Sequence, residues 1–191
     1  YAEIYPIKYI IYEFKDGQNA YLADKLAYAY VEHKEGNTTL KIYQPYNKTG
    51  FKWRTKHNSS VISLWTKIPE KGNLVCICSS VKDALCLWEN TGIPSLAIQG
   101  EGYGMSKTAI EILKKRYSNI IIIFDNDKAG LEDGAKFSKL TGFINIILPQ
   151  FDGGKDISDL FSIIKNKQMF NNKITSLIKK NLPLWNQELL Q

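Results

Sequence analysis

The sequence predicts an α/β protein: a parallel sheet flanked by helices, with an N-terminal α+β subdomain. After residue 73, short apolar segments alternate with segments whose apolar residues have helical spacing, which is typical of strand–helix–strand units. The most apolar segment, NIIIIF at residues 119–124, is typical of a central parallel strand covered on both faces. Before residue 69, tyrosine-rich and β-branched segments are separated by glycine-containing turns, which favours short strands.

A change of pattern at residues 68–73, IPEKGN, predicts a boundary because Pro and Gly concentrate there. We therefore expect three regions: a basic α+β subdomain at 1–70, the alternating domain at 71–165, and a helical C-terminal segment at 166–191. In the first region, IKYIIYEF and TLKIYQPY predict strands, and the helical spacing of apolar residues at 20–33 predicts a helix.

The elements of the second region follow from hydrophobic runs and capping residues. In order, the sequence predicts a strand at 74–78, a helix at 81–92 ending at Gly92, a strand at 95–98, a helix at 106–117 with Ser106 as N-cap, a strand at 119–124, a helix at 128–142 ending at Gly142, a strand at 143–148 and a helix at 156–167.

Composition limits the class of protein. The 191 residues are 44% hydrophobic and carry a net charge of +6, which fits a soluble globular chain and is compatible with a polyanionic partner. No apolar run is long enough for a bilayer and no basic-apolar leader opens the chain, so we expect a cytoplasmic protein. Three cysteines and two histidines indicate buried reduced thiols rather than a disulfide framework or a zinc site.

Two carboxylates follow the most apolar strand. Asp125 and Asp127 lie where open α/β sheets keep their sites, at the carboxyl end of a central strand. Two carboxylates held close repel each other unless a cation lies between them, and Mg2+ (or Mn2+) prefers such oxygen ligands. The alternative is that both residues only form the turn and N-cap of the helix that begins at Lys128.

The stretch FDNDKAG resembles the DxD motif of Toprim domains, which occur in primases, topoisomerases and some nucleases. Ala129 and Gly130 match the helix start of that motif, and Gly130 allows close packing there. Upstream, LVCICSSVKDALCL resembles the first Toprim strand and helix, with Lys82 and Asp83 at the turn. The resemblance covers about half of the chain and implies a Toprim fold with a magnesium-binding acidic cluster.

Downstream, GGKDISDLF resembles the late acidic cluster of Toprim domains. The resemblance implies that Asp156 is a metal ligand, more weakly that Asp159 contributes, and that Lys155 contacts a phosphate or neutralises the cluster. Asp156 is equally suited to cap the last helix, so both roles stay open.

One position departs from the Toprim pattern: Ser79 stands where most members have a glutamate at the end of the first strand. Either the domain is inactive, or Glu101 in QGEGYG supplies the missing carboxylate. The SSVKD stretch followed by that loop resembles phage-type primase-like proteins, as does the upstream KIYQPYNKTGFKWRTK, which favours substitution.

Basic and aromatic residues alternate in FKWRTK. This pattern puts Lys52, Arg54 and Lys56 on one side of a strand and Phe51 and Trp53 on the other. The primase resemblance implies a groove for the template and nucleotides, whereas a half-buried strand with its charges in water explains the same pattern.

The leading hypothesis is a primase-like nucleotidyltransferase that synthesises RNA primers on single-stranded DNA from nucleoside triphosphates. Its expected partners include a replicative helicase or a zinc-binding module. The alternatives are a Toprim nuclease and an inactive nucleic-acid-binding module. The expected residues are Glu101, Asp125, Asp127, Lys82 and Asp83 for catalysis; Glu101, Asp125, Asp127 and Asp156 for the metal; and Lys52, Arg54, Lys56, Lys128 and Lys155 for nucleic acid.

Overall fold

A computed structural model describes residues 3–14, 17–34, 37–56, 61–99 and 104–182. The chain divides into two compact units, Tyr1–Val61 and Ile62–Gln191. The division falls before residues 68–73, where the change of sequence pattern places the boundary. Each unit is described by itself.

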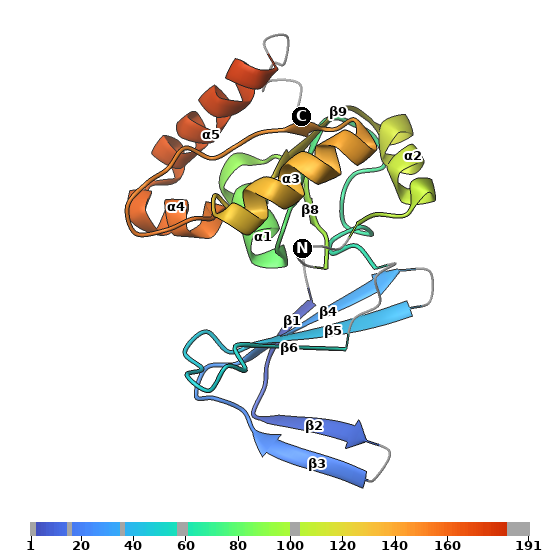
Figure 1. Cartoon of the computed structure of the whole chain (residues 1–191), viewed down its shortest axis with the longest axis vertical. Coiled ribbons are helices and arrows are strands. Elements are labelled where there is room, and N and C mark those ends of the chain that lie inside the picture. The colour runs from blue at the N-terminus through green and yellow to red at the C-terminus, as the bar shows by residue number, and fades with distance from the viewer. Residues whose placement is uncertain (1–2, 15–16, 35–36, 57–60, 100–103, 183–191) are drawn as a thin grey trace. The chain divides into compact units, whose positions relative to one another are not determined.

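The first unit consists of antiparallel strands in its described part (Figure 1). One sheet has the order β1-β4-β5-β6, and β2 and β3 pair as a separate hairpin. The strands are β1 (Glu3–Pro6), β2 (Tyr9–Phe14), β3 (Gly17–Leu22), β4 (Tyr28–Lys34), β5 (Asn37–Tyr43) and β6 (Trp53–Lys56).

The helix expected at residues 20–33 is wrong, because this segment contains the end of β3 and most of β4. The spacing of its small apolar residues reflects burial in one cluster and not a helix. Ala23, Ala27 and Ala29 are buried in one cluster with Ile42 of β5, and Ile7 packs against that cluster. Packing across strands therefore overrides the local pattern.

The strand register gives the sheet of the first unit an aromatic face. Tyr28 is paired with Tyr43, and Tyr43 with Trp53, so the three side chains share one face. The rings of Tyr43 and Trp53 stack with centroids 4.2 Å apart. Arg54 pairs with Ile42 on the opposite face.

The second unit is the expected α/β domain (Figure 1). Its sheet has the order β10-β9-β7-β8, and all of its pairings are parallel. The elements are β7 (Gly72–Cys78), α1 (Val81–Thr91), β8 (Ser95–Ala97), α2 (Lys107–Arg116), β9 (Tyr117–Ile123), α3 (Lys128–Thr141), β10 (Ile144–Asn145), α4 (Ile157–Ile164) and α5 (Lys167–Asn181).

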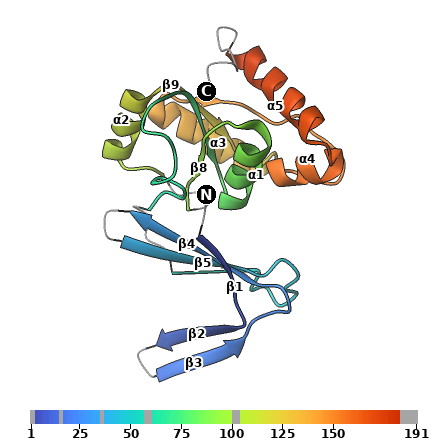
Figure 2. The same cartoon turned by 180° about the vertical axis from the view of Figure 1, so that it is seen from behind.

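The helices cover both faces of this sheet. Figures 1 and 2 show α1 on one side and α3 on the other. This follows from right-handed crossovers, since the chain moves from β7 to β8 in one direction and from β9 to β10 in the other. Helices α4 and α5 pack against α1, and α2 packs against β9.

The core of the second unit lies in the two central strands. Leu74 to Cys78 in β7 have no exposed surface, and Ile121 and Ile122 in β9 have none either. Cys76 and Cys78 are free thiols inside this core, where they pack as small apolar side chains. In the described part of the chain, no helix is long and apolar enough to cross a membrane.

The turn from β9 into α3 depends on a glycine. A Cβ on Gly130 would lie 2.2 Å from the backbone oxygen of Asp125 and 2.9 Å from its Cβ. No side chain larger than hydrogen fits there, which explains the glycine that the motif FDNDKAG carries. This close approach brings the start of α3 against the end of β9.

We expect Gly130→Ala to lower the free energy of unfolding by about 1–3 kcal/mol, because a methyl group would be forced against the Asp125 backbone. Alanine normally stabilises a helix relative to glycine by about 1 kcal/mol. A loss of stability in Gly130→Ala would therefore indicate a steric clash and not an effect of helix propensity. Urea unfolding followed by circular dichroism measures it. Gly104→Ala is the control, since its Cβ would meet nothing within 4 Å; equal effects would contradict the steric argument.

Candidate metal centre at the edge of the parallel sheet

The carboxyl ends of the two central strands meet at one edge of the sheet. Cys78, the last residue of β7, is paired with Ile123, the last residue of β9, so the segments that follow begin side by side. Ser79 is buried there, and its hydroxyl donates a hydrogen bond of 2.7 Å to Oδ1 of Asp125. Ser79 therefore orients a carboxylate but brings no negative charge of its own.

Asp83 is the most buried carboxylate of this edge, with 3% of its surface exposed. It lies in the first turn of α1, whose N-cap is Ser80. The Ser158 amide and hydroxyl donate hydrogen bonds of 3.0 and 2.7 Å to Oδ1 of Asp83, and the Ser80 hydroxyl donates to Oδ2. Asp83 thus ties the start of α1 to α4.

Asp156 comes from the third segment of the site, as the N-cap of α4. Its Oδ1 accepts a 2.8 Å hydrogen bond from the backbone of Asp159. The preceding loop is compact because Gly153 has a φ of 85° and a Cβ on Gly154 would lie 2.3 Å from that of Asp159. A hydrogen bond of 2.7 Å from the Asn126 amide to the Lys155 carbonyl ties this loop to the β9 turn.

The three carboxylates converge. One oxygen from each of Asp83, Asp125 and Asp156 lies within 4.8 Å of the other two. Carboxylate oxygens are the ligands that Mg2+ and Mn2+ prefer, and like charges at this separation need cations nearby. The donor set therefore fits a hard divalent cation such as Mg2+.

Asp127 stands beside these three oxygens rather than among them. It is the N-cap of α3: its Oδ1 accepts a 2.9 Å hydrogen bond from Gly130, and its Oδ2 accepts one from Lys155. The bonds from Gly130 and Lys155 hold the pKa of Asp127 below its usual range. Its capping role, one of the two open alternatives, is present here, and so is the capping role of Asp156.

Two lysines neutralise the carboxylates. Lys82 Nζ lies 3.2 Å from Asp83 and 2.8 Å from Asp156, whereas Lys155 Nζ lies 3.0 Å from Asp125 and also contacts Asp127. Burial alone would lower the pKa of Lys82, but its two carboxylate partners outweigh burial and raise it. Hydrogen bonds to Asp127 and Asp125 raise the pKa of Lys155. Both ammonium groups stay charged at neutral pH.

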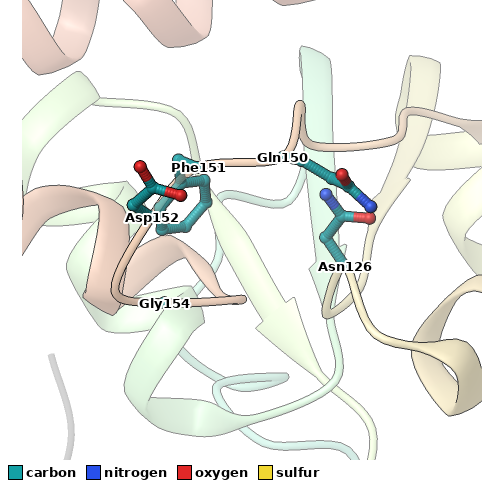
Figure 3. A pocket seen from close by; sticks show the side chains of 5 residues that line it. All are labelled: Asn126, Gln150, Phe151, Asp152 and Gly154. Carbon is teal, nitrogen blue, oxygen red and sulfur yellow. The ribbon is translucent and has the colours of Figure 1, made fainter.

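A polar pocket of about 380 Å³ is lined by Asn126, which directly follows Asp125, and by residues of the loop before α4 (Figure 3). Figure 3 shows the amide side chains of Asn126 and Gln150 close together, with Phe151 and Asp152 further along the loop. The volume is within the range of small-molecule sites.

The other expected residues are placed as follows. Lys128 is exposed at the start of α3, and among the described residues it forms no ion pair. Glu101 lies outside the described residues, so its role stays a prediction. Ser158 went unrecognised, since nothing in the sequence marks it as a donor to Asp83. The sequence predicts a catalytic role for Asp83 and not a role as a metal ligand. One signal for the ligand role is its position four residues after Ser79, because side chains in a helix point toward the N-terminus and so toward the strand end.

The basic residues of the first unit lie against aromatic rings. Lys52 Nζ is 5.7 Å from the Tyr43 ring centroid, and the Arg54 guanidinium is 4.1 Å from that of Phe51. Phe51 and Lys52 precede β6, so the expected alternation holds only from Trp53 onward. The side chain of Lys56 is outside the described set.

We expect Asp83→Ala to lower the free energy of unfolding by about 3 kcal/mol, because three hydrogen-bond donors and the Lys82 ammonium lose a buried acceptor. Asp127→Ala is the matched control and should cost about 1 kcal/mol, the usual loss for a helix cap. Urea unfolding in a metal chelator compares the two. Equal losses would mean that the buried contacts of Asp83 contribute little.

The second unit is similar to a known family of domains. Residues 76–161 match the family model described as Toprim-like. No curated protein matches the chain in sequence. Solved structures do match in fold, among them the primase fragment of the bacteriophage T7 primase-helicase, with a TM-score of 0.59 and 16% identity. The match covers 82% of this chain and 65% of that one.

Two further matches are bacterial-type primases. A DNA primase domain from Pseudomonas aeruginosa has a TM-score of 0.63 at 14% identity, covering 86% of this chain and 55% of that one. The DnaG primase catalytic domain bound to single-stranded DNA has 0.62 at 18%, covering 87% and 57%. The chain thus spans less than two thirds of each of these structures. Residues 76–161 are therefore similar to Toprim-like domains, and the fold of the chain is similar to that of these primase structures.

Proposed function

We propose that this chain is the catalytic core of a primase-like nucleotidyltransferase, which joins nucleoside triphosphates into RNA primers on single-stranded DNA. The observation that carries the proposal is the convergence of Asp83, Asp125 and Asp156 from three segments at the carboxyl edge of a Toprim-like sheet. The fold likeness to primase cores supports primer synthesis over other Toprim reactions.

In this proposal Asp83, Asp125 and Asp156 hold the metal. Asp83 supplies the third carboxylate, since Ser79 stands where most Toprim domains have a glutamate. These carboxylates would hold Mg2+, which when bound would supply positive charge for phosphoryl transfer. Ser79 fixes the carboxylate of Asp125 through its hydrogen bond. Lys155 holds Asp125 and Asp127 in one orientation and presents positive charge where a triphosphate would arrive.

The neighbouring pocket supports a nucleotide as the substrate. Asn126, the residue after Asp125, and Gln150 line the pocket with amide donors and acceptors, and amides hydrogen-bond the edges of bases and sugars. In the first unit, Lys52 and Arg54 are proposed to contact template phosphates. A replicative helicase or a zinc-binding module stays a proposed partner; the T7 structure comes from a primase-helicase.

We expect Asp125→Asn to reduce metal-dependent primer synthesis by at least about a hundredfold, because a ligand loses its charge. The assay incubates the protein with labelled single-stranded DNA and Mg2+, with and without nucleoside triphosphates. New RNA that depends on nucleotides supports a primase, whereas shortening of the labelled DNA would indicate a nuclease. Glu132→Gln, an exposed carboxylate of α3, is the control and should keep full activity. Full synthesis by Asp125→Asn would overturn the proposal.

We expect Lys52→Ala to weaken binding to single-stranded DNA about fivefold and to lower the slope of log Kd against log salt by about 0.7, the value for one phosphate contact. Fluorescence anisotropy of a labelled oligonucleotide over a salt series measures both. Lys25→Ala removes an exposed lysine of the same unit outside the strands and should leave the slope unchanged. If the two variants behave alike, Lys52 is not in the template site.

A further inference from the structure

Lys82 occupies a position that a helix does not favour for a cation. It lies in the first turn of α1, just after the N-cap Ser80, where the helix dipole places partial positive charge. Its side chain is nevertheless folded inward and only 28% exposed, with Nζ 2.8 Å from Asp156 and 3.2 Å from Asp83. The two carboxylates, and not the helix, therefore determine where this ammonium lies.

The charges around the cluster leave room for a single divalent ion. Four carboxylates meet here, those of Asp83, Asp125, Asp127 and Asp156, and the two ammonium groups that pair with them belong to Lys82 and Lys155. Among the residues that the structure describes, two negative charges of these four carboxylates stay uncompensated, which matches one divalent cation. Ser79 adds no charge, because its hydroxyl is a neutral donor to Asp125. A second divalent ion would bring net positive charge into a partly buried site.

We propose that Lys82 serves as a built-in cation of this site, held between Asp83 and Asp156, and so limits the cluster to one divalent ion instead of two. The inference rests on the metal site of the proposed function. Lys82 is here a residue that sets metal stoichiometry and affinity. It acts through the two carboxylates with which it pairs.

The test counts Mn2+ ions on the purified chain, because Mn2+ takes the same oxygen ligands as Mg2+ and its free form is measured directly by electron paramagnetic resonance. Calorimetric titration of the same samples gives the affinity. We expect the wild type to bind one ion and Asp125→Asn to lose it. Lys82→Gln should bind a second ion, or bind the first at least about tenfold more tightly, because a positive charge close to the site is removed.

Two variants separate charge from structural disturbance. Lys82→Arg keeps the charge and should retain the stoichiometry of the wild type. Lys139→Gln removes an exposed lysine from the last turn of α3 and should change the affinity less than about twofold. In the described segments, Lys139 forms no ion pair. Circular dichroism melting curves establish that each variant is folded.

The outcomes distinguish the inference from the function on which it rests. Two ions on the wild type, or identical binding by wild type and Lys82→Gln, overturns the role of Lys82 while the metal site stands. Binding by Lys82→Gln but not by the wild type overturns the one-ion limit, because Lys82 then excludes every ion, and it overturns metal-dependent catalysis as well. No Mn2+ on either folded protein overturns both.

Discussion

Mutual repulsion of carboxylates is the constraint on which this site depends. Oxygens of Asp83, Asp125 and Asp156 lie within 4.8 Å of one another, in an environment that buries Asp83 almost completely. Ionised groups so close are unfavourable unless cations and hydrogen-bond donors compensate them. The chain supplies both: Lys82 and Lys155 provide the positive charge, and serine hydroxyls and backbone amides provide the donors. The geometry of the edge is arranged around this compensation.

Helix capping fixes Asp156, a member of the cluster, and Asp127, which lies beside the cluster. Asp156 caps α4, and Asp127, beside the cluster, caps α3, so each carboxylate has one oxygen fixed by a backbone amide. The remaining oxygen of each faces a lysine. Capping and charge pairing therefore do not exclude each other, and the contact between Gly130 and Asp125 keeps the β9 turn tight enough to serve both.

The antiparallel unit contributes a different kind of surface. Its register gathers Tyr28, Tyr43 and Trp53 on one face, and Lys41 lies 5.3 Å from the Trp53 ring centroid. Burial lowers the pKa of Lys41, since desolvation outweighs the attraction of Glu32. A lysine that lies over an aromatic ring has less side-chain conformational freedom than a solvated lysine. Its stem packs against the ring while its ammonium supplies charge, so one side chain contributes both.

The sequence by itself determined the second unit and the positions of its carboxylates. Apolar runs, capping residues and glycines predicted most of its strands and helices, because each of these signals acts within a few residues. Tertiary structure decided the rest. It replaced the helix expected at residues 20–33 by strands, and it selected Asp83 rather than Asp127 as the third member of the cluster. These outcomes depend on pairing and close approach between distant segments, such as Asp83 with Ser158, which local patterns do not encode.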